Sequence, residues 1–170
     1  GLGLKGVAFP TSMPGLNLDS REMWPIYELI SKLDVPVVIH PIVRQPLWGG
    51  ERHRISITVA KEYEIAKATC EVLYGVLPYF PELKFVMPHY GGGMPAVKGR
   101  VIAHHEPEGW KIPEDLVDVG KSQRQLKQLG LLQDFDKYFD RLYFDTSVYN
   151  EWMPIMEAAI LCIKTDRLCF

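Results

Sequence analysis

Two histidines of this sequence stand directly after apolar runs that are typical of buried strands. His40 follows residues 37–39 and His89 follows residues 85–88. A neutral imidazole at such a position serves either as a metal ligand or as a general acid/base. A single buried histidine is more often a core residue that hydrogen-bonds to a neighbour. Two histidines at the same end of their strands favour a shared functional site.

Three consecutive glycines, Gly91, Gly92 and Gly93, begin two residues after His89. Glycine allows the backbone to approach a ligand closely, because it carries no Cβ. The helix expected to follow them presents N–H groups at its N-terminus, which favour a carboxylate. This segment therefore predicts a place where a small anionic compound binds next to His89.

Several further residues have both a functional and a structural interpretation. Asp145 either faces the mouth of the site or caps the end of its strand. For His53 we prefer a place in a solvated loop over a contact with substrate. The loop with residues 48–50 is a candidate cover for the pocket. We prefer a polar helix end over a metal cluster for His104, His105 and Glu106, and core packing for Trp24, Tyr27 and Trp152.

The elements that position these residues alternate along the chain. Apolar runs predict strands over 5–10, 35–40, 83–89, 142–146 and 168–170, and helical periodicity predicts helices over 20–34, 56–74, 94–105, 123–140 and 151–163. Such alternation is typical of α/β proteins with a parallel sheet and helical crossovers. G-x-x-x-x-G-K-[ST] does not occur, and the G-x-G-x-x-G at residues 1–6 runs into the first expected strand instead of following a strand, so nucleotide-binding open sheets lose support. An open doubly wound sheet and an arc of a (β/α)8 barrel both place His40 and His89 at the catalytic edge.

Particular faces of these elements are expected to be buried. Residues 35–40 are nearly all apolar, as in a strand covered on both faces. Ser20 is expected to cap the first helix, and residues 106–122 to form a loop or lid. The helical stripes expected to be buried are Met23, Ile26, Ile30 and Leu33; Ala60, Tyr63, Ala66, Cys70 and Leu73; and Trp152, Ile155, Met156, Ala159, Ile160 and Ile163.

Composition and charge exclude several classes of partner. The 170 residues include 19 Lys+Arg and 21 Asp+Glu, a net charge of −2, which argues against nucleic-acid binding through many phosphates. No apolar stretch approaches the roughly 18 residues of a membrane span, and no signal peptide is visible. Cys70, Cys162 and Cys169 lack C-x-x-C spacing, so we expect reduced thiols in a cytoplasmic protein. The chain begins at Gly1 and stops within an expected strand, so we expect a fragment of a longer protein.

Two segments that contain the histidines carry a resemblance to a known family. They are LDVPVVIHP at 33–41 and FPELKFVMPHYGG at 80–92. With them the chain resembles the amidohydrolase-2 family, typified by aminocarboxymuconate-semialdehyde decarboxylase and resorcylate-type decarboxylases. Supporting similarity, in the family's order and over nearly the whole chain, lies at 5–7, 24–28, 99–100, 142–147 and 166–170.

The resemblance implies that this chain is the second half of a (β/α)8 TIM barrel, from strand four to strand eight. His40 matches the strand-five histidine that binds one divalent metal ion, zinc or manganese. His89 matches the strand-six histidine that acts as acid/base. Arg100 matches an arginine that reaches the site of a neighbouring subunit and holds a substrate carboxylate, for which a guanidinium is suited. The implied partners are a small-molecule carboxylate substrate and further copies of the same chain in a homo-oligomer. The structural alternative for Arg100 is a solvated residue on a helix surface.

Departures from the family pattern set the expectation for the 170 residues alone. The family's H-x-H pair is absent, and its last metal-binding aspartate would lie beyond Phe170. A metal site needs three or four converging protein ligands. We therefore expect residues 1–170 to be a single fragment of a barrel domain that, by itself, binds no stoichiometric metal and is inactive. Within the complete enzyme we expect decarboxylation or hydrolysis of a small carboxylated or cyclic compound. The alternatives are a non-catalytic truncated barrel module and a small-molecule-binding α/β domain.

Overall fold

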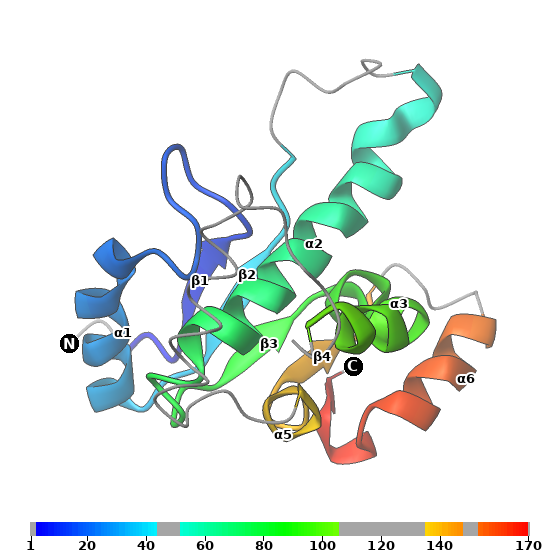
Figure 1. Ribbon diagram of the computed structural model, residues 1–170. Helices are drawn as coiled ribbons and strands as arrows, with labels where there is room; N and C mark the ends of the chain where they lie inside the picture. Colours follow the sequence, from blue (N-terminus) through cyan, green and yellow to red (C-terminus); the bar gives the residue numbers. More distant parts are fainter. Residues whose placement is uncertain (1–2, 44–51, 106–134, 148–152, 170) are drawn as a thin grey trace.

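A five-stranded parallel sheet forms the centre of the computed structural model, which describes residues 3–43, 52–105, 135–147 and 153–169. Every strand pairs in parallel with the next strand of the sequence, in the order β1-β2-β3-β4-β5 (Figure 1). A doubly wound sheet reverses its strand order at a switch point, and this sheet does not. The sequential order is that of an arc of a barrel. The strands are β1 (Val7–Pro10), β2 (Val37–His40), β3 (Phe85–Met87), β4 (Tyr143–Asp145) and β5 (Leu168–Cys169).

Helices connect the strands as the alternating pattern predicts. Single-turn 3-10 segments precede α1 and β5, a kinked six-residue 3-10 segment precedes α2, and a π-helical turn follows α2 directly. The helices are α1 (Trp24–Leu33), α2 (Val59–Glu71), α3 (His89–His105), α5 (Phe135–Phe139) and α6 (Met153–Cys162). The shorter segments are η1 (Arg21–Met23), η2 (Arg52–Ile57), η3 (Val72–Val76) and η5 (Thr165–Arg167).

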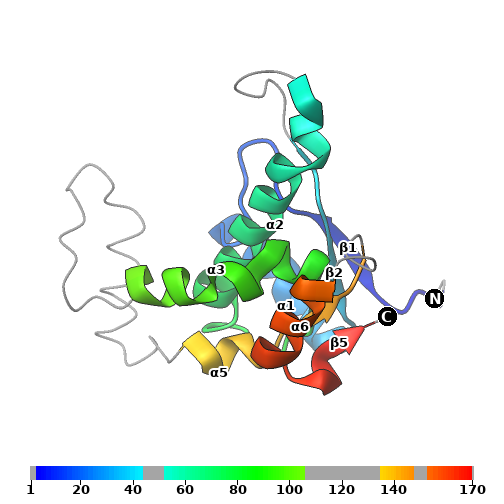
Figure 2. The same ribbon diagram turned by 90° about the vertical axis from the view of Figure 1, so that its right-hand side faces the viewer.

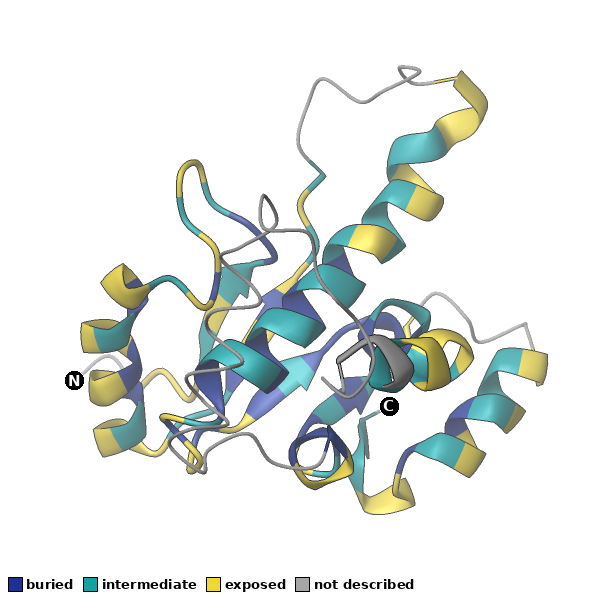
Figure 3. Cartoon of the chain, in the orientation of Figure 1, coloured by how far each residue is buried: buried dark blue, intermediate teal, exposed yellow. Residues whose placement is uncertain are grey.

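The two faces of the sheet have different surroundings. One, here called the covered face, packs against helices and consists of Val7, Phe9, Val37, Ile39, Phe85, Met87 and Phe144. The other, called the open face, consists of Ala8, Val38, His40, Val86, Tyr143 and Asp145, which are exposed or half-buried. Figure 2 shows α2, α3 and α5 to one side of β1 and β2. The prediction that residues 35–40 are buried on both faces is not met within the described residues, because Val38 and His40 lie on the open face. Figure 3 shows the same contrast in α1, which is buried toward the sheet and exposed on its outer side.

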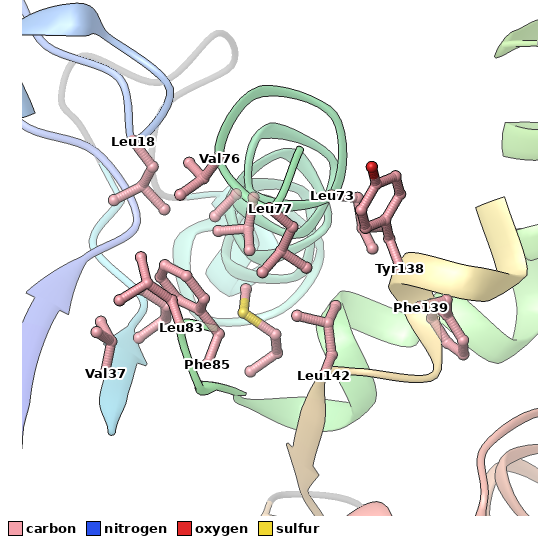
Figure 4. Close-up of a cluster of buried hydrophobic side chains, with 14 of the residues drawn as sticks. Leu18, Val37, Leu73, Val76, Leu77, Leu83, Phe85, Tyr138, Phe139 and Leu142 are labelled. Carbon is pink, nitrogen blue, oxygen red and sulfur yellow. The ribbon is translucent and has the colours of Figure 1, made fainter. Parts of the chain in front are cut away.

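The hydrophobic core lies between the covered face and the helices. Phe85 and Phe144 are fully buried there, and Phe139 of α5 lies 5.0 Å from Phe144 between ring centroids. Figure 4 shows side chains from η3 and from Leu77 directly after it in one cluster with those of β2, β3 and α5. The buried members in that view include Leu18, Val37, Leu73, Val76, Leu77, Leu83, Phe85, Tyr138, Phe139 and Leu142.

The buried stripe of α1 differs from the prediction. Met23 and Ile30 are buried as expected, but Tyr27 takes the central place, and Ile26 and Leu33 are 42% and 59% exposed. The Tyr27 hydroxyl donates to the Leu18 carbonyl at 2.7 Å, so the aromatic ring packs in the core while its polar end has a partner. Ser20 precedes η1, yet its hydroxyl accepts from the Asn17 N–H instead of capping the helix.

The stripe of α2 also differs from the prediction. Ile65, Ala68 and Thr69 are buried, whereas Tyr63 is 66% exposed. The stripe continues into η3, where Gly75 lies so close to the loop before α1 that a Cβ there would stand 2.2 Å from the Asp19 Cβ. That loop is also held by a hydrogen bond from the Leu18 N–H to Glu71 at 3.1 Å.

Of the stripe predicted for α6, Ala159 and Ile163 are buried, Ile155 and Met156 are half-buried, and Ile160 is 57% exposed. No helix within the described part of the chain is long and apolar enough to span a membrane. Three predictions fall outside the described residues: the loop or lid at 106–122, most of the helix at 123–140, and the placement of Trp152.

Candidate active site

His40 ends β2 with its backbone fixed and its imidazole exposed. Its carbonyl accepts a hydrogen bond from the Thr11 N–H at 2.9 Å, and the Ile42 N–H donates to the Thr11 hydroxyl at 3.0 Å. These bonds tie the chain on both sides of His40 to the end of β1. The imidazole itself has no hydrogen-bond partner among the described residues, and it belongs to the open face. A fixed backbone with an imidazole that has no partner among the described residues suits a ligand.

His89 stands two residues beyond β3 and is held by two carboxylates. Its side chain is only 4% exposed, and its Nδ1 lies 2.7 Å from Oε1 of Glu62 in α2. Its backbone N–H donates to Oδ1 of Asp145 at 2.9 Å. Both contacts join sequence-distant elements, so they fix His89 relative to α2 and β4 together.

The backbone after β3 runs through the left-handed region. His89 to Gly93 have φ angles between 50° and 75°, and the regular part of α3 begins only after them. A Cβ on Gly92 would lie 2.4 Å from the Ala66 nitrogen and from the Glu62 carbonyl oxygen. The glycine run was predicted to permit close approach to a ligand. In the structure Gly92 permits close approach to the backbone of α2, which brings Glu62 to His89.

Asp145 acts as the cap of its strand, one of the two interpretations drawn from the sequence. Its Oδ1 accepts from the Ser147 N–H at 3.1 Å and from the Ser147 hydroxyl at 2.6 Å, in addition to the His89 N–H. Burial, and then the nearby Asp145 charge, raise the pKa of Tyr90, so this phenol stays neutral.

For the remaining candidates, the described residues give no contact with the two histidines. Arg100 is exposed on α3, and no contact within the described part of the chain joins it to His40 or His89. His53 is exposed in η2 with a φ of 57°. The side chains of His104 and His105, with Glu106 and the loop at 48–50, lie outside the described residues.

Glu62 is the site residue that sequence reasoning missed. It lies four residues before Ala66 and seven before Thr69, on the face of α2 that packs against the turn at residues 91–93. The signal that points to it is this i, i+4, i+7 repeat of Glu, Ala and Thr, which places a carboxylate in a row of small residues. The stripe predicted for this helix followed the larger apolar side chains instead.

The His, Cys, Asp and Glu side chains of the described residues determine whether they can hold a metal ion. Among the described residues no three His, Cys, Asp or Glu side chains converge to hold a metal ion. His40 fits as one ligand, since an exposed neutral imidazole at a strand end is a usual metal donor. One imidazole does not constitute a metal site, so further ligands from outside the described residues are required. All three cysteines, each half-buried, are free thiols in the structure.

Comparisons with known proteins agree with this geometry. The family model described as amidohydrolase matches residues 1–170, so the chain belongs to the amidohydrolase family, and its arc of parallel strands is part of a TIM-type barrel. The 2-amino-3-carboxymuconate-6-semialdehyde decarboxylase of Dictyostelium discoideum is 33% identical over 169 residues, which are 97% of this chain and 44% of that enzyme. The gamma-resorcylate decarboxylase of a Polaromonas strain is 30% identical over 162 residues, covering 91% and 44% of the two chains.

Solved structures show the same relationship. A dihydroxybenzoic acid decarboxylase from Polaromonas, with bound manganese and the inhibitor 2-nitroresorcinol, superimposes with a TM-score of 0.66 at 27% identity. It is matched over 91% of this chain and 44% of its own length. The IDCase of Metarhizium anisopliae in apo form gives a TM-score of 0.72 at 25% identity, over 98% and 43% of the two chains. The chain thus spans less than half the length of these relatives.

Proposed function

We propose that residues 1–170 are one piece of the barrel domain of a metal-dependent decarboxylase, from strand four to strand eight, that acts on a small carboxylated or cyclic compound. The observation that carries the proposal is the position of His40 and His89 after neighbouring strands, at the carboxyl edge of a parallel sheet. Barrel enzymes carry their catalytic groups at this edge. Relatives named as decarboxylases support the reaction type.

In this proposal His40 binds a divalent metal ion, either zinc or manganese. A divalent ion polarises a carbonyl or carboxylate oxygen and makes a water molecule more acidic. Manganese in the related Polaromonas structure supports a divalent ion, without choosing between the two metals here. His40 would contribute its imidazole from a backbone fixed to β1, so that the ligand needs little reorganisation on binding.

His89 is the proposed acid/base, and Arg100 the proposed contact for the substrate carboxylate. His89 is buried and fixed by hydrogen bonds, as a group that transfers protons in a defined direction must be. Arg100 is exposed, so it is available to the site of a neighbouring copy in a homo-oligomer. The free cysteines support the proposed cytoplasmic location.

A second candidate, a barrel module without chemistry, is favoured by one observation. The described residues contain no set of three possible metal ligands. The two candidates differ in metal content, because a module without chemistry does not require a metal ion. A third possibility keeps the metal and the histidines but changes the reaction to hydrolysis.

The test uses the full-length protein. We expect about one divalent ion per chain, and CO2 release from 2,6-dihydroxybenzoate or 2-amino-3-carboxymuconate-6-semialdehyde, the substrates indicated by the relatives' names. His40→Ala should lose metal and activity together. His89→Ala should keep most of the metal and lose turnover. Metal analysis and turnover measurements check both variants. Full activity in His89→Ala, or full metal occupancy in His40→Ala, would remove the corresponding assignment.

The roles of Arg100 and of self-association have their own test. Arg100→Ala should raise KM by about tenfold or more, because a charged hydrogen bond to the substrate is lost. For the 170-residue chain alone, sedimentation should show association, since β1 and β5 are sheet edges and the open face is uncovered. A compact monomer with cooperative unfolding contradicts the association.

A further inference from the structure

The contact between Glu62 and His89 is short, enclosed and formed by groups from different elements. Glu62 belongs to the first turn of α2, and its Oε1 lies 2.7 Å from Nδ1 of His89. The side chains are 22% and 4% exposed. The second carboxylate oxygen of Glu62 is buried without a hydrogen-bond partner in the described part of the chain. The imidazole is therefore the described group that compensates the buried carboxylate.

From this geometry we infer that Glu62 is the positioning residue of His89, an inference that rests on the proposed function. A carboxylate only accepts hydrogen bonds, so the Nδ1 facing it must carry the proton. Neutral His89 is then the tautomer whose Nε2 accepts. Nε2 becomes the atom that takes up the proton in the reaction and later returns it.

The surrounding backbone leaves the pair little freedom to move. Gly92 contacts the α2 backbone at Ala66 and at Glu62 itself, and its φ of 72° excludes most other residues. The Thr69 hydroxyl, one further turn along α2, lies 3.3 Å from the Gly91 carbonyl oxygen. His89 is also anchored through its N–H to Asp145. The backbone of His89 is thus already fixed, and the hydrogen bond from Nδ1 to Glu62 determines the orientation of the imidazole ring.

The same carboxylate also has an electrostatic effect on proton transfer. When Nε2 takes up a proton, the ring becomes an imidazolium whose charge faces Glu62. A fixed negative charge at this distance stabilises the protonated ring without reorganisation. Glutamine at position 62 would still accept the Nδ1 hydrogen bond but would lack the charge. Alanine would remove both effects, so the two substitutions separate orientation from charge.

The kinetic test uses the full-length metal-loaded protein and the two substrates named above. Glu62→Gln should lower kcat about tenfold, and Glu62→Ala about 100-fold, on the scale known for hydrogen-bond partners of metal-binding histidines. KM and metal content should stay within twofold. Glu64→Gln is the matched control, because Glu64 lies on the same helix with an oxygen that is equally buried and unpartnered among the described residues. It should leave kcat unchanged. Unchanged kcat in Glu62→Ala overturns the inference.

A spectroscopic measurement tests the pair without any substrate. Imidazole ¹⁵N–¹H spectra, with His89 assigned from the signal lost in His89→Gln, should show the proton on Nδ1 in the wild type and in Glu62→Gln. In Glu62→Ala the Nδ1–H tautomer of His89 should no longer be more populated than the Nε2–H tautomer. A wild-type His89 protonated on Nε2 overturns the inference whatever the activity. If the wild type carries the proton on Nδ1 but has no activity, the proposed function and the catalytic role of the pair are both overturned. Only the hydrogen bond between Glu62 and His89 then remains.

Discussion

The covered and open faces of the sheet differ in how deeply their side chains are buried. Ile39 on the covered face is 1% exposed, whereas Val38, its neighbour in β2, is 41% exposed. The two histidines differ in a similar way. His89 contacts Glu62 and Asp145, whereas the His40 imidazole has no described partner.

The two apolar runs that end in His40 and in His89 look alike in the sequence, yet their histidines have different surroundings in the structure. The His89 turn is complete within the chain, since its carboxylate partners and its glycine contacts are all present. The end of β2 has a fixed backbone, but the described residues offer no partner to the His40 side chain. Substitutions on the covered side should therefore affect stability, and those on the open face should affect metal binding or association.

The largest effect is expected at Gly92. Gly92→Ala should lower the free energy of unfolding by more than about 4 kcal/mol, because its Cβ would collide with the backbone of α2. Gly93 has nearly the same φ, 71°, but no atom within 4 Å of its Cβ position. Gly93→Ala should thus cost only the left-handed strain, about 1–2 kcal/mol. Urea unfolding measures both. Equal costs would show that α2 does not confine the turn.

A second prediction compares neighbouring residues of β2. Ile39→Ala should cost about 3 kcal/mol in the 170-residue chain, because it leaves a cavity beneath the helices. Val38→Ala should cost less than about 1 kcal/mol there. If the rest of a barrel covers the open face, Val38→Ala should become clearly more costly in the full-length protein. Thermal unfolding of both variants in both chains provides the measurement, and a large cost for Val38→Ala in the short chain contradicts the open face.

A smaller effect is expected from the buried hydroxyl of Tyr27. Tyr27→Phe removes the 2.7 Å hydrogen bond to the Leu18 carbonyl and should cost about 1.5 kcal/mol, because that carbonyl remains buried. Burial raises the pKa of Tyr27, so the phenol is neutral at all physiological pH values and the cost should not vary with pH. Unfolding at pH 6 and pH 8 checks this, and a stability equal to the wild type would contradict the hydrogen bond.

The smallest effect is a pH dependence from two carboxyls beside the covered face. Burial raises the pKa of Glu71 above its usual value of 4.5, and loss of hydration around the carboxyl raises that of Asp19 above 3.8, although the Asp19 residue as a whole is exposed. In this range the folded state holds more protons than the unfolded chain, so these groups lower stability as the pH rises. The lysine contact of Glu71 opposes this effect only in part. Glu71→Gln should therefore become more stable relative to the wild type between pH 4 and pH 7. A relative stability that falls over this range contradicts the raised pKa.

The positions of the strands could be predicted from the residue pattern, whereas their sequential order was predicted only with the help of the family resemblance. Apolar runs placed every strand within about two residues, because a strand buried against helices needs consecutive apolar side chains. Alternation alone fits both a doubly wound sheet and a barrel arc. The resemblance pointed to the barrel, and the sequential pairing of the strands confirms the arc.

Helix faces and site contacts were harder to predict. Tyr63 and Ile26 fit a helical period but are exposed, because several apolar stripes coexist on α1 and α2 and only packing selects one. Glu62 was missed because a carboxylate near a helix N-terminus usually lies in water. The left-handed turn that begins at His89 depends on contacts with α2, which lies far away in sequence.

The sequential strand order also has a consequence for folding kinetics. Since no pairing skips a strand, the sheet can grow by adding one strand and its helix at a time, with contacts that stay relatively local. The longest connection, residues 88–142, separates β3 from β4. Each doubling of a flexible loop adds only about 0.6 kcal/mol to the entropy of its closure. The joining of β4 to β3 should still be the slowest of the four pairings, with β1–β3 formed before it.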